Sequence, residues 1–168
     1  DNDGQSEITP GATKGKVVLF TTCYGNRNWP SRVDDLVAVY EHNGIRVALA
    51  EQEVCCGMPK LELGDLNAVA KAKEKNVSVL AGWVDRGWAI VTPIPSCTLM
   101  FKQELPLIYP VDNAVLRVRD AMYDPFYYLM LRHRHGQLTT EFKHSVGQVT
   151  YQVALHPRVQ HISIKTLS

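Results

Sequence analysis

Short apolar runs and a helical repeat alternate along the first third of the chain. The run Lys16–Thr21 lies between a glycine and a polar loop, which predicts a buried strand. Apolar residues then recur at helical spacing over Val33–His42, and Asn43-Gly44 supplies a helix C-cap. The apolar segment Ile45–Ala50 predicts a second strand. A strand, a helix and a strand in this order predict a right-handed unit with parallel strands.

The rest of the chain continues this alternation. The pattern predicts a helix over Gly64–Asp85 and then a strand over Trp88–Thr92. A further helix is expected to begin at Ser96 or Cys97 and to be broken by Pro106 and Pro110, and another to begin at Pro125 and end at Gly136. The last predicted element is a fourth strand over Gln148–Leu155. Together these elements predict an α/β fold. We expect a small open parallel sheet of about four strands with flanking helices.

The ends of the chain differ from its middle. Residues 1–15 are polar, contain Gly and Pro and begin without a methionine, which is typical of a linker or tail with something attached upstream. We expect one domain over 16–147. The remaining residues, 148–168, are expected to be a short additional segment.

The charge pattern narrows the kinds of partner. The net charge is +1 and the Lys and Arg residues are scattered, so no basic surface for a nucleic-acid backbone is expected. No apolar run reaches the roughly 20 residues that span a bilayer, and the start lacks a secretory signal pattern. We therefore expect a cytoplasmic chain whose partners are small molecules and proteins.

The candidate chemistry lies in four cysteines, Cys23, Cys55, Cys56 and Cys97. Each follows a predicted strand, and the carboxyl ends of parallel strands share one edge of the sheet. An adjacent pair closes a disulfide only in a strained ring, which favours thiolate chemistry in a reducing compartment. Gly57, after the pair, allows a sharp turn beside a bulky group. Four soft thiolates suit an iron–sulfur cluster or zinc.

Two plainer readings of the cysteines stay open. Free cysteines are among the most buried residue types, so the four could be ordinary core residues. Zinc would fit the ligand type, although cysteines two residues apart are absent and an adjacent pair is awkward around one small ion. His156 is expected to be a structural residue next to Pro157 rather than a ligand.

Four segments of the chain resemble a known family. They are VVLFTTCYGN, EVCCGMPKLELGD, PSCTLMFKQELPLIYP and DPFYYLMLRHR, which together cover about 16–134. In order and spacing they resemble the cysteine-rich CCG domain of heterodisulfide reductase B-type subunits and of anaerobic glycerol-3-phosphate dehydrogenase C-like proteins. The resemblance implies a Rossmann-like CCG domain.

The chain departs from that family at two places. The family closes its motif with a Cys-x-x-Cys, and the first of these cysteines falls at Ile94. That leaves Cys23, Cys55, Cys56 and Cys97, which favours an ordinary four-iron, four-sulfur (4Fe-4S) cluster over a non-cubane one. Residues 148–168 resemble the start of a second repeat, but Leu155-His156 stands where a Cys-His pair is expected. The chain thus resembles one CCG half.

The resemblance also implies a function. It predicts a cluster-binding, electron-transfer part of an anaerobic-type oxidoreductase that is itself not catalytic. Expected partners are a flavoprotein, a ferredoxin-like protein or a quinone-linked membrane subunit, which would hold the chain at the inner face of the membrane; a homo-oligomer is an alternative. Two other functions stay open: a zinc-binding or metal-free assembly module of a redox complex, and thiol or disulfide reduction at the cluster.

Overall fold

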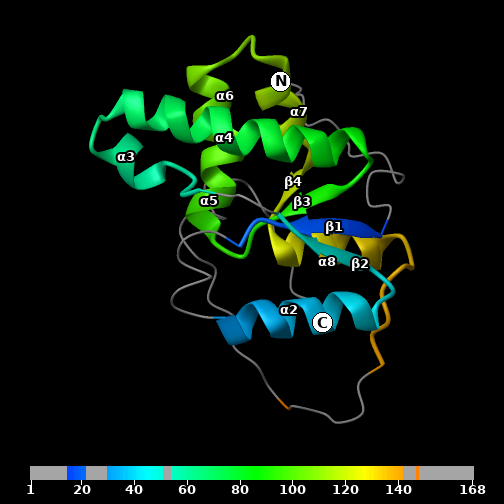
Figure 1. Ribbon diagram of the computed structural model, residues 1–168. Coiled ribbons are helices and arrows are strands. Elements are labelled where there is room, and N and C mark those ends of the chain that lie inside the picture. The colour runs from blue at the N-terminus through cyan, green and yellow to red at the C-terminus, as the bar shows by residue number, and fades with distance from the viewer. Residues whose placement is uncertain (1–14, 22–29, 51–53, 142–146, 148–168) are drawn as a thin grey trace, which may run out of the picture.

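A parallel sheet with helices on both faces forms the body of the molecule (Figure 1). The computed structural model describes residues 15–21, 30–50, 54–141 and 147. The strands are β1 (Lys16–Leu19), β2 (Arg46–Leu49), β3 (Ala89–Val91) and β4 (Met122–Tyr123). The helices are α2 (Pro30–His42), α3 (Met58–Glu62), α4 (Leu66–Asp85), α5 (Pro95–Leu99), the π-helix η1 (Met100–Glu104), α6 (Leu105–Ile108), α7 (Asn113–Ala121) and α8 (Pro125–Arg134). The predicted α/β class is confirmed.

The sheet reverses its direction of growth at β1. Its strands are all parallel and lie in the order β2-β1-β3-β4. The chain crosses from β1 to β2 through α2, and it later returns to the other side of β1 as β3. In open parallel sheets, ligands bind beyond the carboxyl ends of the strands at such a reversal. The segments that follow β1 and β3 therefore occupy the position where a functional site is expected.

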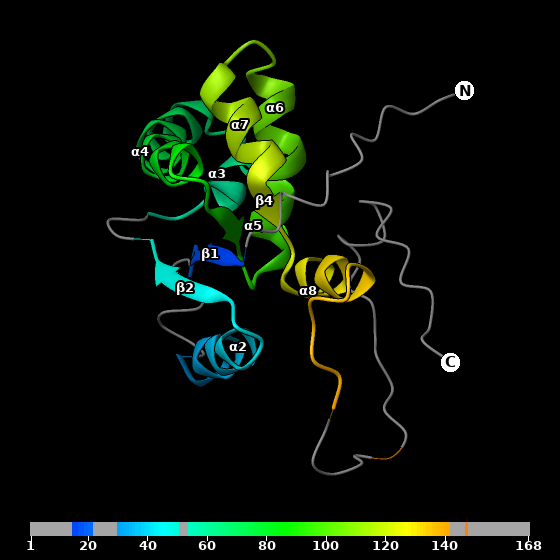
Figure 2. The same cartoon turned by 90° about the vertical axis from the view of Figure 1, so that its right-hand side faces the viewer.

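Side chains alternate between two buried cores, one on each face of the sheet. The first core, which we call the cysteine face, includes Val18, Phe20, Ile90, Cys56, Cys97, Val69, Leu80, Met100, Phe101 and Val115. The second core, the tyrosine face, includes Val17, Leu19, Val91, Tyr40, Tyr123, Tyr128 and Leu131. Figure 2 shows α4 and α7 on one side of the sheet and α2 and α8 on the other. Both faces of the central strands β1 and β3 are covered, which explains why these two strands consist mainly of apolar residues.

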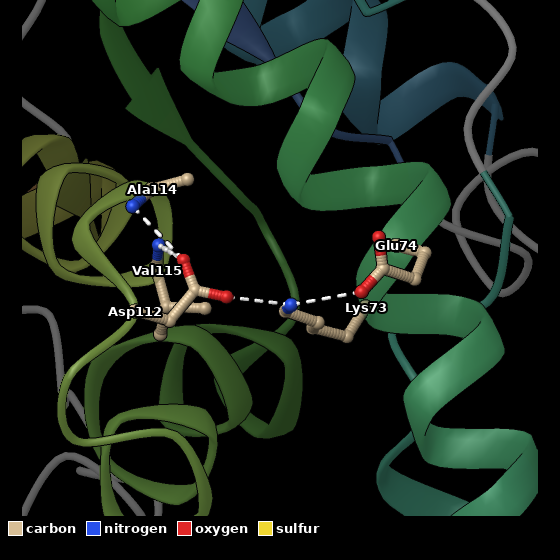
Figure 3. A network of polar contacts seen from close by, with 5 residues as sticks. All are labelled: Lys73, Glu74, Asp112, Ala114 and Val115. Atoms are coloured by element: carbon tan, nitrogen blue, oxygen red, sulfur yellow. Dashed lines mark hydrogen bonds and ion pairs between the residues drawn. The ribbon is translucent and has the colours of Figure 1, made fainter.

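Aspartate caps begin three of the longer helices. Asp65, Asp112 and Asp124 precede α4, α7 and α8, and each accepts hydrogen bonds from backbone N–H groups of the first turn. Asp112 also pairs with Lys73 of α4, whose Nζ lies 2.6 Å from its carboxylate and 2.9 Å from Glu74 (Figure 3). The Lys73–Asp112 pair joins the start of α7 to the middle of α4.

The helix after β3 is longer than the sequence predicts. A break at Pro106 was expected, but the chain stays helical through η1 and α6 to Ile108. In the π-helix the Leu105 N–H donates to the Met100 carbonyl, five residues back. Pro106 lacks the N–H of an ordinary helical turn and its ring crowds the preceding turn. The wider π turn before it relieves this conflict, so the prediction of a break there was wrong.

Three further elements were not predicted: the short helix α3, the helix α7 and the two-residue strand β4. β4 adds the fourth strand of the described sheet by pairing with β3. The predicted strand Gln148–Leu155 lies outside the described residues. Among the described helices, none is both long and apolar enough to cross a membrane.

Candidate metal centre

Cys97 lies in the first turn of the helix that follows β3. The chain enters α5 through an extended Ile94, with Pro95 at the first helical position. Proline is favoured there because its fixed φ suits the helix and its missing N–H would have no intrahelical partner. The Cys97 N–H donates to the Ile94 carbonyl at 3.0 Å, and its side chain is buried. The helix start thus fixes Cys97 beyond the carboxyl end of β3.

The adjacent Cys55 and Cys56 lie in a loop between β2 and α3. Gly57 follows them with a left-handed backbone, φ 97°, which costs a residue with a Cβ about 1–2 kcal/mol. A Cβ there would make ordinary van der Waals contact with the side chains of Ala72 and Met100, 3.5 Å away, so the backbone conformation and not a lack of space favours glycine. At this turn Cys56 is buried and Cys55 is half-buried.

Cys56 and Cys97 form a close pair of thiols. The Cys97 S–H donates to the Cys56 sulfur, and the two Sγ atoms lie 3.1 Å apart, well beyond the roughly 2.05 Å of a disulfide bond. This hydrogen bond lowers the pKa of Cys56 to about 7; burial opposes the shift, and a hydrogen bond from the Met58 backbone and one from the Cys55 thiol assist it. Thiolates are the metal-binding form of cysteine. At neutral pH the pair therefore offers one thiolate readily.

The surroundings of the thiol pair are apolar but include buried hydroxyls. Phe101 packs edge-on against Phe20 with ring centroids 5.2 Å apart. Thr92 and Thr98 are buried, and their hydroxyls find no hydrogen-bond partner in the part of the chain that the structure describes. Such orphaned groups are rare in protein interiors. Thr98 follows Cys97 directly in α5, so one of these buried hydroxyls belongs to the same helical turn as a candidate ligand.

The described part of the predicted ligand set consists of Cys55, Cys56 and Cys97. Cys23 lies outside the described residues, as does His156. Within the described ranges no three Cys, His, Asp or Glu side chains gather as a metal site. The structure therefore shows a pair of thiols with a third cysteine adjacent in the chain, and the complete ligand set stays a prediction.

Two residues near this region were misjudged or missed. Lys102 was expected to be a surface charge, but it is half-buried, its Nζ lies 5.4 Å from the centre of the Tyr123 ring, and burial lowers its pKa. Asn76 was not singled out, yet it is buried on α4 and hydrogen-bonds the cysteine loop. A signal for Asn76 existed in the sequence: it lies one helical turn before Leu80, on the apolar face of the helix.

Comparison with known proteins connects this region to a family. The sequence profile of a family described as cysteine-rich domain (CCG) matches residues 17–102. No solved structure matches the chain significantly.

Several proteins share partial similarity with the chain. The C subunit of the anaerobic glycerol-3-phosphate dehydrogenase of Escherichia coli K12 is 31% identical over 105 residues, which are 62% of this chain and 26% of that protein. The B subunit of the fumarate reductase (CoM/CoB) of Methanothermobacter marburgensis is 29% identical over 65% of this chain and 21% of its own length. Lactate utilization protein A of Bacillus thuringiensis is 34% identical over 65% of this chain and 45% of that protein. The chain thus covers less than half the length of each.

Proposed function

Since the chain belongs to the cysteine-rich CCG domain family, we propose that it is an iron–sulfur electron-transfer domain of an oxidoreductase. The observation that carries the proposal is the buried Cys56–Cys97 pair, with sulfurs 3.1 Å apart. The two residues reach this position from different strand ends of one sheet, where redox cofactors are commonly held in open parallel folds. Two of the similar proteins are named as subunits of a dehydrogenase and a reductase, which agrees with a redox role.

The proposed ligands are Cys23, Cys55, Cys56 and Cys97. When bound, a cluster supplies reversible one-electron transfer, at a potential set by its charge, its hydrogen bonds and its exposure to solvent. Four thiolates suit a 4Fe-4S cluster. Ile94 occupies the position of the first cysteine in the family's closing Cys-x-x-Cys, and the lack of this fifth cysteine disfavours a non-cubane cluster.

The residues around the pair would prepare it for this task. The hydrogen bond from Cys97 holds the pKa of Cys56 at about 7, so little energy is needed to remove a proton before metal binding. Met100 and Phe101, which directly follow α5, are buried in the same core cluster as Cys56 and Cys97, and an apolar shell of this kind limits the access of water to a cluster.

We extend the proposal to partners and location. Electrons would pass to and from other redox subunits, such as a flavoprotein, a ferredoxin-like protein or a quinone-linked membrane subunit, and the chain would work in the cytoplasm beside them. Residues 16–147 would form the cluster domain, after a polar linker at 1–15. Residues 148–168 would begin a second repeat.

Anaerobic reconstitution tests this function directly. The full chain, supplied with iron and sulfide under reducing conditions, should turn brown, absorb broadly near 400 nm and bleach on reduction, because thiolate-to-iron charge transfer produces that absorption. Iron and sulfide analysis would give the cluster type. A colourless protein that takes up stoichiometric zinc instead would contradict the proposal and support a zinc-binding assembly module.

A further inference from the structure

A single buried amide on α4 holds the loop that carries the adjacent cysteines. We propose that Asn76 is a positioning residue, which fixes the Cys55–Cys56 segment so that the Cys56 sulfur meets the Cys97 sulfur. Its importance for a cluster rests on the function proposed above. Its effect on the geometry of the thiol pair does not.

The Asn76 side chain forms hydrogen bonds with two consecutive residues of the loop. Its Oδ1 accepts from the Val54 N–H at 3.1 Å, and its Nδ2 donates to the carbonyls of Val54 at 3.3 Å and Cys55 at 3.1 Å. An asparagine amide has two donor hydrogens and an acceptor oxygen. Asn76 therefore acts toward this loop much as a neighbouring strand would.

The buried position of Asn76 indicates that its contact with the cysteine loop is structural. Its side chain is 1% exposed, and the other buried residues of α4 are Val69, Val77, Leu80 and Ala81. Burying an amide among apolar residues costs free energy unless the amide is hydrogen-bonded. Hydrogen bonds to the cysteine loop offset this cost for the Asn76 amide. The same bonds give the backbone groups of the loop a partner, because residues 54–56 belong to no helix or strand.

The loop is thereby fixed on both sides of Cys56. Before it, Asn76 orients the peptide units of Val54 and Cys55. After it, the Gly57 carbonyl accepts from the N–H groups of Lys60 at 3.0 Å and Leu61 at 2.9 Å. Two peptide orientations set from opposite ends leave Cys56 little freedom, since the backbone has only two soft dihedrals per residue. The 3.1 Å approach to Cys97 depends on that restriction.

The test compares Asn76→Leu with a matched variant of the same helix. Leucine has the branched shape of asparagine but makes no hydrogen bond, so the loop loses its anchor while the core stays filled. Val77→Ala is the control, because it disturbs the same helix and core without removing a bond to the loop. If the bulkier leucine prevents folding, Asn76→Ala replaces it, since alanine is the best helix former.

Two measurements separate this inference from the proposed function. In the metal-free, reduced full chain, diamide joins Cys56 and Cys97 in a disulfide by accepting two electrons and two protons, and peptide mapping gives the rate. In the reconstituted chain, chelator challenge gives the rate of cluster loss, and electron paramagnetic resonance reports the cluster environment. We expect Asn76→Leu to slow the disulfide at least tenfold, to lose iron at least tenfold faster and to change the resonance spectrum, whereas Val77→Ala stays within twofold of the parent chain.

The outcomes are distinct. A parent chain that takes up no iron contradicts the proposed function, and the disulfide rate still decides the role of Asn76. Equal disulfide rates in Asn76→Leu and the parent chain would overturn the positioning role. Equal slowing in Asn76→Leu and Val77→Ala would also overturn it, because the amide would then contribute only general stability.

Discussion

The two faces of the sheet use the same strands but treat their ionisable groups in opposite ways. On the tyrosine face, burial raises the pKa of Tyr40 and Tyr123, the latter to about 12, and the Tyr40 hydroxyl donates to the Pro125 carbonyl at 3.1 Å. On the cysteine face, the hydrogen bond from Cys97 lowers the pKa of Cys56 to about 7 despite burial. Near neutral pH the two tyrosine hydroxyls stay protonated, whereas the Cys56 thiol loses its proton readily. The tyrosine face therefore contributes packing alone, whereas the cysteine face also presents the thiol pair that we propose as part of a cluster site.

The largest expected effect lies on the cysteine face. Cys97→Ser should reduce the iron bound after reconstitution by at least tenfold, because a hydroxyl replaces a proposed thiolate ligand. The metal-free protein should lose little stability, since the change is nearly isosteric. Iron analysis and thermal unfolding of the same samples check both parts. His156→Ala is the matched control, and equal iron loss in the two variants would identify His156 as a ligand instead.

The next largest effect lies on the tyrosine face. Tyr128 is fully buried, and its ring lies 5.8 Å from that of Tyr40 and 5.5 Å from that of Tyr123. Tyr128→Ala should lower the free energy of unfolding by about 3–5 kcal/mol, the usual cost of removing a buried aromatic ring. Denaturant unfolding of the metal-free chain measures this. A cost below about 1 kcal/mol would contradict the stabilising role assigned to the tyrosine face.

A smaller effect isolates one hydrogen bond of the same face. Tyr40→Phe removes the hydroxyl that donates to the Pro125 carbonyl and should cost about 0.5–1.5 kcal/mol, the usual net contribution of one intramolecular hydrogen bond. Iron binding should be unchanged, since the hydroxyl lies on the face opposite the cysteines. Parallel unfolding and reconstitution measurements check both statements. Reduced iron binding at full stability would show that the two faces are coupled.

The sequence predicted the part of the fold that depends on long periodic patterns. β1, β2, β3, α2, α4 and α8 lie within a few residues of their predicted positions. β4 was missed because two residues are too short for a period to be visible. The π turn before Pro106 was missed because a proline in the chain normally marks the end of a helix.

Only part of the candidate site could be predicted from the sequence. Strand-end placement correctly grouped Cys56 and Cys97, because the sheet topology dictates that edge. The contribution of Asn76 depends on α4 packing against the cysteine loop, a contact between segments that are distant in the chain. Local periodicity carries no information on such a contact, so the structure was needed to find it.

The smallest expected effect is a pH-dependent one, at the Lys73–Asp112 pair that joins the helices of the cysteine face (Figure 3). The hydrogen bond from Lys73 holds the pKa of Asp112 below its usual range, and the same bond raises the pKa of Lys73. The stabilising effect of Asp112 is therefore present above its unfolded pKa of about 3.9 and is lost as the pH falls through the lower folded pKa. That of Lys73 is present below about pH 10.4 and is lost as the pH rises through the higher folded pKa.

Asp112→Asn separates the charge from the helix cap, because asparagine caps a helix about as well as aspartate. We expect the variant to be less stable than the parent chain by up to about 1 kcal/mol near neutral pH, the usual range for a partly exposed ion pair. The difference should shrink toward both pH 3 and pH 11, where one partner begins to lose its charge. Urea unfolding at the three pH values measures it. A difference that stays constant from pH 3 to pH 11 would contradict the contribution of the ion pair, because the loss would then not follow the charge of either partner.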